Sequence, residues 1–143
     1  MAVRRFMLPI LASAFVLVVA GCAKEPVYYP VEGKLTLNGK PMTVGRLQFV
    51  PDADKGNASQ EEARARVDPA TGQFALKTEE KIGCRPGWYK VVVFAFAEPG
   101  PGEGPKPPVW IASQKYADPK TTSLSVEVTA EPMPGQYDFN LLP

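Results

Sequence analysis

The stretch Val31-Glu-Gly-Lys-Leu-Thr-Leu-Asn-Gly39 decides the fold class that the sequence predicts. Residues 31–37 alternate apolar and polar side chains, which is the period of a half-buried β-strand. The Asn-Gly pair that follows accepts positive φ at both central positions of a tight turn, so it is a strong hairpin signal. We therefore expect a strand, a two-residue turn and a return strand at residues 44–51, with Leu47 and Phe49 on one face.

The longest β-like apolar run is at residues 89–96, and it predicts a central strand that is buried on both faces. Seven segments have the length and composition of short strands: residues 31–37, 44–51, 63–67, 73–76, 89–96, 123–129 and 137–141. Turn-forming residues separate these segments, and no segment has a convincing amphipathic helical pattern. The sequence thus predicts an all-β fold, a seven-stranded antiparallel sandwich.

The connections between these segments differ in character. Residues 52–62 are polar and predict a loop. The adjoining segment fits two structures, a helical turn over residues 60–66 or a strand over residues 63–67. Residues 97–108 are dominated by proline and glycine, which is typical of an extended or mobile loop, and residues 110–122 have no regular pattern.

The N-terminal segment predicts export. Arg4 and Arg5 precede an apolar stretch at residues 6–20, which is shorter than a membrane span of roughly 20 residues and has the layout of a secretory signal peptide. Leu17-Val-Val-Ala-Gly-Cys22 resembles the bacterial lipobox, in which signal peptidase II cuts before the cysteine and lipid is attached to its sulfur. An ordinary signal peptide or an uncleaved anchor is the alternative.

The lipobox resemblance divides the chain into a lipoprotein signal peptide at residues 1–21, a lipidated tether at residues 22–30 and a domain at residues 31–143. Two or more acyl chains on Cys22, palmitate among them, hold a protein firmly at a membrane, whereas one chain holds it marginally. Position 23 is Ala rather than Asp, and by resemblance to the enterobacterial sorting rule this favours the outer membrane over the inner one. The expected location is therefore the cell envelope, facing the periplasm or the exterior.

Composition excludes several classes of function. The chain contains no histidine, which rules out mechanisms that need imidazole as a base or as a metal ligand. Without Arg4 and Arg5, 14 basic residues face 15 acidic ones, so no basic field attracts nucleic acid. Cys84 is the second cysteine of the chain. It is a reactive thiol, a partner in an intermolecular disulfide or, as we favour, a small buried residue.

The ordered motifs resemble one known family. The opening stretch is followed by Leu47-Gln-Phe-Val-Pro51, by Thr71-Gly-Gln-Phe-Ala-Leu76 and by Pro86-Gly-Trp-Tyr-Lys-Val91. This set resembles the carboxypeptidase regulatory-like domain, whose fold is a transthyretin-like (prealbumin-like) β-sandwich, and the chain is similar to small exported lipoproteins of planctomycete-type bacteria. The resemblance covers residues 31–143 and implies no catalytic residue and no cofactor.

Few residues are candidates for ligand contact. Trp110 and Tyr116, together with Trp88 and Tyr89, either offer aromatic rings to a ligand such as a glycan or pack in the core. Asp68 lies in a predicted turn and supplies one oxygen donor, whereas calcium takes about six to eight, so we expect no metal site there.

These observations predict a non-catalytic, lipid-anchored module of the cell envelope that serves binding, spacing or assembly. We expect contact through the loop at residues 97–108 or through a sheet edge, with the membrane, an envelope protein or a glycan as partner. The alternative is an envelope carbohydrate-binding protein that uses Trp110 and Tyr116, and a hydrolase is the least favoured function. The sequence leaves the oligomeric state open.

Overall fold

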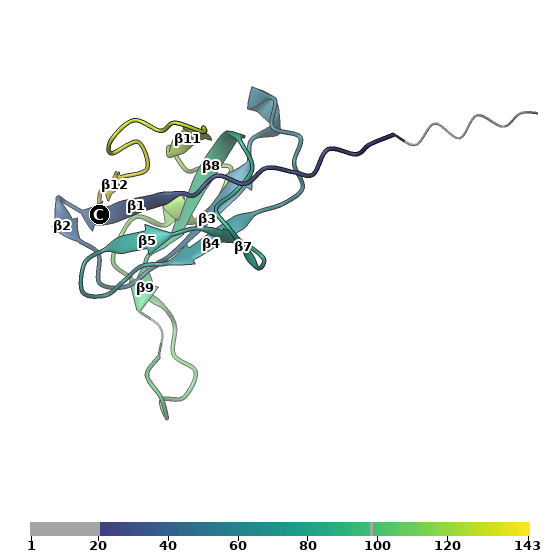
Figure 1. Ribbon diagram of the computed structural model, residues 1–143. Helices are drawn as coiled ribbons and strands as arrows, with labels where there is room; N and C mark the ends of the chain where they lie inside the picture. The colour runs from purple at the N-terminus through teal and green to yellow at the C-terminus, as the bar shows by residue number, and fades with distance from the viewer. Residues whose placement is uncertain (1–20, 98) are drawn as a thin grey trace, which may run out of the picture.

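A computed structural model describes residues 21–97 and 99–143, so the signal peptide expected at residues 1–21 lies, except for Gly21, outside the described residues. The described chain is an all-β structure of open sheets, with two short 3-10 turns, η1 (Ala53–Lys55) and η2 (Gln114–Ala117). Within this part of the chain we find no apolar helix of the length that a membrane crossing needs. Figure 1 shows the dark purple stretch that follows residue 20 extending away from the strands.

The smaller sheet is organised around β1 (Glu32–Leu37), which lies between β12 (Phe139–Leu141) on one edge and β2 (Lys40–Pro41) with β5 (Gln73–Ala75) on the other. Asn38 and Gly39 have φ of 50° and 76°, which confirms the predicted tight turn between β1 and β2. β12 runs parallel to β1, so the prediction of a wholly antiparallel fold is wrong. The two strands come from opposite ends of the domain and no hairpin joins them, so nothing forces them to be antiparallel.

The larger sheet has six strands in the order β11-β8-β3-β4-β6-β7, all paired antiparallel. Their bounds are β3 (Arg46–Pro51), β4 (Ala63–Arg66), β6 (Lys77–Thr78), β7 (Lys81–Ile82), β8 (Gly87–Phe94) and β11 (Ser125–Val128). β8 is central, as predicted, but its burial on both faces holds only in part. Val92 is buried on the outer face, whereas its outer-face neighbours Lys90 and Phe94 are half-buried.

Beyond Phe94 the chain continues into a short hairpin of β9 (Phe96–Ala97) and β10 (Val109–Trp110). In Figure 1 the segment that joins these two strands projects from the body of the domain. The backbone N–H of Ile111 donates to the carbonyl of Ala95 at 2.9 Å, which joins the hairpin to the end of β8. The irregular segment predicted at residues 110–122 therefore contains the end of β10 and the η2 turn.

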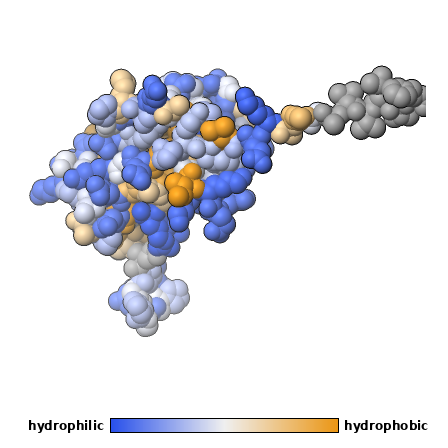
Figure 2. Space-filling view, viewed as in Figure 1, coloured by the Kyte–Doolittle hydropathy of each residue, from blue (hydrophilic) through white to orange (hydrophobic). Residues whose placement is uncertain are grey.

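The core lies between the smaller sheet around β1 and the larger six-stranded sheet. The ring of Phe49 on β3 faces that of Phe139 on β12 at 6.1 Å between centroids and that of Tyr89 on β8 at 5.8 Å. Leu35 on β1 and Leu47 on β3 are fully buried in the same cluster. Figure 2 shows a mostly hydrophilic surface with small, separate hydrophobic patches, as expected when the apolar side chains are packed inside.

Two further expectations are settled by the strand pairing. The segment at residues 60–66 was open to a helical turn or a strand, and it forms the strand β4. The return strand of the first hairpin is β2, not residues 44–51, because β3 pairs with β4 and β8 in the other sheet. Gly45 lies between β2 and β3 with φ of 146°, a conformation that L residues rarely adopt, and the chain passes to the second sheet there.

Candidate functional site

The end of the tether is fixed to the domain. The backbone N–H of Tyr29 donates to the carbonyl of Cys84 at 2.9 Å, and the N–H of Cys84 donates to the carbonyl of Tyr29 at 3.1 Å. A Cβ at Gly83 would lie 1.9 Å from the Tyr29 oxygen, so only glycine permits this approach. Tyr28 and Tyr29 thus pack on the domain and are half-buried, and residues 22–27, which precede them, are exposed.

A polar cluster holds the Tyr28 side chain beside this bridge. Its hydroxyl donates to Glu61 Oε2 at 2.8 Å and accepts from Lys81 Nζ at 3.1 Å. Arg85 Nε and Glu61 Oε2 form an ion pair at 2.7 Å. The hydrogen bond with Tyr28 is the main cause that raises the pKa of Lys81 and that of Arg85. We call Tyr28, Tyr29, Glu61, Lys81 and Arg85 the tether clamp.

Cys84 lies beneath this clamp as a buried free thiol, which confirms the structural alternative favoured for it. Burial raises the pKa of the Cys84 thiol to about 12, against an ordinary value of 9.0, despite an opposing hydrogen bond with Tyr89. Burial also raises the pKa of the Tyr89 phenol to about 12. The Tyr89 hydroxyl donates to the carbonyl of Arg85 at 2.9 Å, so it is a satisfied core group. A thiol that stays protonated is a poor nucleophile.

The aromatic residues proposed for ligand contact separate into core and surface. Tyr116 and Tyr89 are 3% and 1% exposed, so neither ring face is accessible, and the prediction of ligand contact by Tyr116 is wrong. Tyr116 is held inside because its ring belongs to the core cluster and its hydroxyl accepts from the N–H of Leu142 at 3.3 Å. Trp110 is half-buried, and its ring meets that of Phe96 edge-on at 5.0 Å. Ligand contact by Trp110 stays a prediction.

Asp68 has a structural role in its turn. Its Oδ1 accepts from the N–H of Ala70 at 2.7 Å, and its backbone carbonyl accepts from the N–H of Gly72 at 2.8 Å. These bonds are those of a turn stabilised by an Asp side chain. Across residues 21–97 and 99–143, no three histidine, cysteine, aspartate or glutamate side chains gather as a metal site would require.

The outer face of the larger sheet carries a groove that the sequence did not predict. Arg46 on β3 is the register partner of Arg66 on β4 and of Phe94 on β8, and Arg64 lies one pleat further along β4. A hollow of about 450 Å³ is lined by these four residues with Leu47, Gln48 and Ala65. A second hollow of about 310 Å³ shares Arg46, Arg66 and Phe94 with the first and adds Phe96. We call these two hollows, which share three lining residues, the arginine groove.

The arginine groove has a preorganised cation at its centre. The Arg46 guanidinium carbon lies 5.8 Å from the centroid of the Phe94 ring and 5.7 Å from that of Phe96. Two rings within about 6 Å attract a cation and limit its rotamers. The Arg64 Nη2 atom lies 3.2 Å from Glu62 Oε2, and Glu62 also accepts from the Gln48 amide. The signal that a sequence analysis can use is Arg64-Ala-Arg66, because a strand places both arginines on one face.

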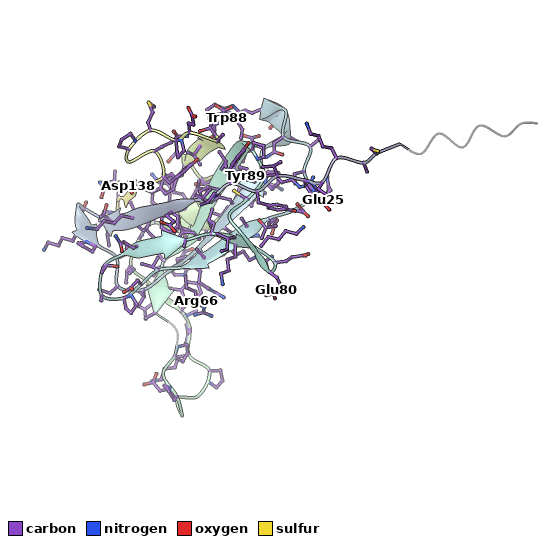
Figure 3. The ribbon with its side chains drawn as sticks, in the orientation of Figure 1. Glu25, Arg66, Glu80, Trp88, Tyr89 and Asp138 are labelled. Carbon is purple, nitrogen blue, oxygen red and sulfur yellow. The ribbon has the colours of Figure 1, made fainter. Side chains whose placement is uncertain are left out.

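Part of the tether clamp and part of the arginine groove lie at opposite ends of β8, whereas Glu61 of the clamp and Arg64 of the groove line one common hollow. Cys84, which pairs with Tyr29, is three residues before the start of β8 at Gly87, and Phe94 of the groove is its last residue. In Figure 3, Arg66 lies toward the end from which the β9–β10 segment projects, and Glu25 lies on the departing tether. Comparisons with protein-family models, with curated proteins and with solved structures give no match. The resemblance to the carboxypeptidase regulatory-like domain therefore stays a prediction.

Proposed function

We propose that this protein is a non-catalytic module of the cell envelope, lipidated at Cys22, which presents a binding surface on the side away from its anchor. The observation that carries the proposal is the tether clamp, which fixes Tyr28 and Tyr29 near one end of β8, while the hollow lined by Phe94 and Phe96 lies at the other end. A domain that floated on a long free tether would need no such fixed attachment.

The geometry sets two distances. Residues 22–27 are exposed and, at no more than about 3.6 Å per residue, reach roughly 20 Å from the lipidated cysteine to the clamp. β8 has eight residues, and at about 3.3 Å per residue it separates the Cys84 side of the clamp from the Phe94 end of the groove by roughly 26 Å. An anchored domain is therefore held close to the bilayer, with the Phe94 end of its groove on the far side. Outer-membrane location, favoured by Ala23, is part of the proposal.

The absence of histidine from the whole sequence supports a non-catalytic role. The buried Cys84 thiol, with its raised pKa, supports it too, because an inaccessible protonated thiol neither attacks a carbonyl nor binds a metal. Asp68, the one carboxylate in a candidate metal turn, already accepts a hydrogen bond from the N–H of Ala70 within that turn.

The test of anchoring is expression of the full chain in a bacterial host, with Cys22→Ser as the matched variant. Intact mass and membrane fractionation are measured on both. We expect the wild type to lose residues 1–21, to gain the mass of acyl chains and to sediment with membranes, and the variant to do none of these. A wild type that is released without lipid overturns the proposal.

A second candidate function is carbohydrate binding, and the observation that favours it is the ring pair of Trp110 and Phe96 at the edge of the arginine groove. Amphipathic rings at an open groove are common contacts for sugars. Trp110→Ala tests this candidate, with Trp88→Ala as the control on the same molecule. Retention on immobilised glycans that is lost only with the first variant supports it, and equal retention of both variants contradicts it.

A further inference from the structure

Exposed apolar side chains flank the tether clamp. Ile82, on the edge strand β7, is 66% exposed, and Val27, the last exposed residue of the tether, is 52% exposed. Each is the chain neighbour of a clamp residue, because Val27 precedes Tyr28 and Ile82 follows Lys81. Lys81 Nζ and the Tyr28 hydroxyl lie 3.1 Å apart, so the clamp brings both apolar positions to one end of the domain.

Pro86 is a third exposed apolar residue at this end. The bridge between Tyr29 and Cys84 is antiparallel, so Val27 and Pro86, each two residues beyond it, lie on the same side of the bridge. Both are exposed, and proline has no backbone N–H that would need a partner. Ile82 lies on the other side of the bridge. We call Val27, Ile82 and Pro86 the docking patch.

We propose that the docking patch rests on the zwitterionic headgroup layer of the bilayer that holds lipidated Cys22. This inference rests on the lipid anchoring proposed above, and it names the surface of the domain that faces the membrane. The exposed tether of residues 22–27 reaches no more than roughly 20 Å, and the clamp fixes its end beside the patch. A connection this short gives a high effective concentration, so a contact too weak for a free protein becomes populated.

The clamp side chains suit the boundary between headgroups and acyl chains. The Tyr28 ring is half-buried, with Lys81 Nζ at 4.5 Å and the Arg85 guanidinium carbon at 5.9 Å from its centroid. Tyrosine rings and long cationic side chains are typical of this boundary, because their apolar parts lie toward lipid while their polar ends stay in water. Lys81 donates to Tyr28 and Arg85 pairs with Glu61, so the contact needs no unpaired positive charge.

Other partners fit this end of the domain less well. Residues 24–27 and 79–86 contain three basic and three acidic side chains, and Glu61 of the clamp adds a fourth acidic one. This balance gives no attraction to a strongly anionic surface or to nucleic acid. A protein partner that adds a strand needs an edge of some length, whereas β7 has only two residues.

The test measures how close the patch comes to the headgroups in vesicles of phosphatidylcholine, a fraction of which carries a nitroxide quencher on the headgroup. The full-length lipidated protein is labelled with a thiol-reactive fluorophore at Glu80→Cys, an exposed position in the turn before β7. In Figure 3, Glu80 lies toward the side from which the tether leaves. The native cysteines stay unlabelled, because lipid blocks Cys22 and Cys84 is buried. Val109→Cys, on β10 beyond the far end of β8, reports the opposite end of the domain.

Two matched substitutions are made in the Glu80→Cys protein. Ile82→Asp places a charge in the patch, and Val109→Asp places one at a similarly exposed aliphatic residue outside it, at 66% and 69% exposure. We expect the equilibrium constant for docking, taken from the quenched fraction, to fall about tenfold or more with Ile82→Asp and less than about twofold with Val109→Asp. The label at Val109→Cys is expected to stay unquenched.

A label at Glu80→Cys that the nitroxide does not quench, or that is quenched equally with Ile82→Asp, overturns the docking. Emission that shifts only as the protein-to-lipid ratio rises assigns the patch to a second copy of the chain and overturns it too. Anchoring is scored separately, by the mass of the acyl chains and by sedimentation with the vesicles. A chain without lipid overturns the proposed function and this inference together, whereas an anchored chain with an unquenched label overturns this inference alone.

Discussion

Replacement of Gly83 by alanine tests whether the tether is clamped as described. Gly83 has φ of 83°, and a Cβ there would lie 1.9 Å from the carbonyl oxygen of Tyr29. Gly39 is the matched control, because its φ is 76° and a Cβ there meets nothing within 4 Å. Both substitutions place alanine in the left-handed region, at about 1–2 kcal/mol each. The difference between them isolates the close approach of the tether.

The magnitude of that difference follows from the bonds that must break. The added methyl group displaces Tyr29 and removes its two backbone hydrogen bonds with Cys84, at 2.9 and 3.1 Å. At about 0.5–1.5 kcal/mol net for each bond, Gly83→Ala loses about 1–3 kcal/mol more free energy of unfolding than Gly39→Ala. Displacement of Tyr29 also uncovers the buried Cys84 thiol.

Urea unfolding of the full-length protein in detergent measures the first effect, and iodoacetamide labelling of Cys84 in the folded state measures the second. We expect labelling in Gly83→Ala and none in Gly39→Ala or in the wild type, whose Cys22 sulfur is blocked if it is lipidated. Equal losses of stability in the two variants, with Cys84 unlabelled in both, would refute the clamp and the short free tether that it implies.

Three further predictions concern stability and association. The pKa values of Cys84 and Tyr89 are raised in the folded state to about 12, so their contribution to stability is complete below pH 9 and is lost as the pH rises toward 12. Because of Cys84, we expect the free energy of unfolding of the wild type in urea to be about 1 kcal/mol lower at pH 10 than at pH 8. The drop is expected to be smaller in Cys84→Ala. Gly33→Ala places a Cβ 2.1 Å from the backbone oxygen of Tyr137, just before β12, and we expect it to abolish soluble expression. A stable variant would show that β1 and the segment before β12 are not packed as described. Gln136 Nε2 donates to the carbonyl of Glu127 on the edge strand β11 at 2.7 Å, so Gln136→Leu uncovers an edge and is expected to shift the protein to larger species in size-exclusion chromatography; an unchanged elution volume would contradict this.

Local signals in the sequence predicted local structure well. The Asn38-Gly39 turn needs only two residues with positive φ, and both have it. Leu47 and Phe49 share a buried face because alternation is a property of the strand itself. Local signals do not say which strand pairs with which. Residues 44–51 were expected to pair back on β1, but β3 pairs with β4 and β8, since the position of Gly45 and the burial of Phe49 against β8 and β12 are decided by the whole core.

The candidate site, too, was predictable from the sequence only in its local features. Tyr116 is as aromatic as Trp110, and nothing in the sequence near either residue says that one ring is buried and the other half-exposed. The arginine groove combines Arg46 from β3 with Arg64 and Arg66 from β4, strands joined by a loop of eleven residues that contains η1. Strand alternation predicts that the β4 pair shares a face once β4 is known to be a strand. The third arginine joins them only through the strand register.

The separation between Cys84 and the Phe94 end of the groove leads to a last prediction, that these two ends of β8 act independently. Both are attached to β8, but Cys84 and Phe94 are separated by the whole length of a central strand that β3 and β11 hold on both sides. Perturbations more than about 7–10 Å apart that share no contact have additive effects. In a Trp88→Phe background, Gly83→Ala is therefore expected to leave the emission of Trp110, which packs against Phe96 beyond the far end of β8, unchanged while it uncovers Cys84. A shifted Trp110 emission in that variant would mean that β8 transmits the state of the tether to its far end, and the domain would then be a sensor of its own attachment instead of a rigid support.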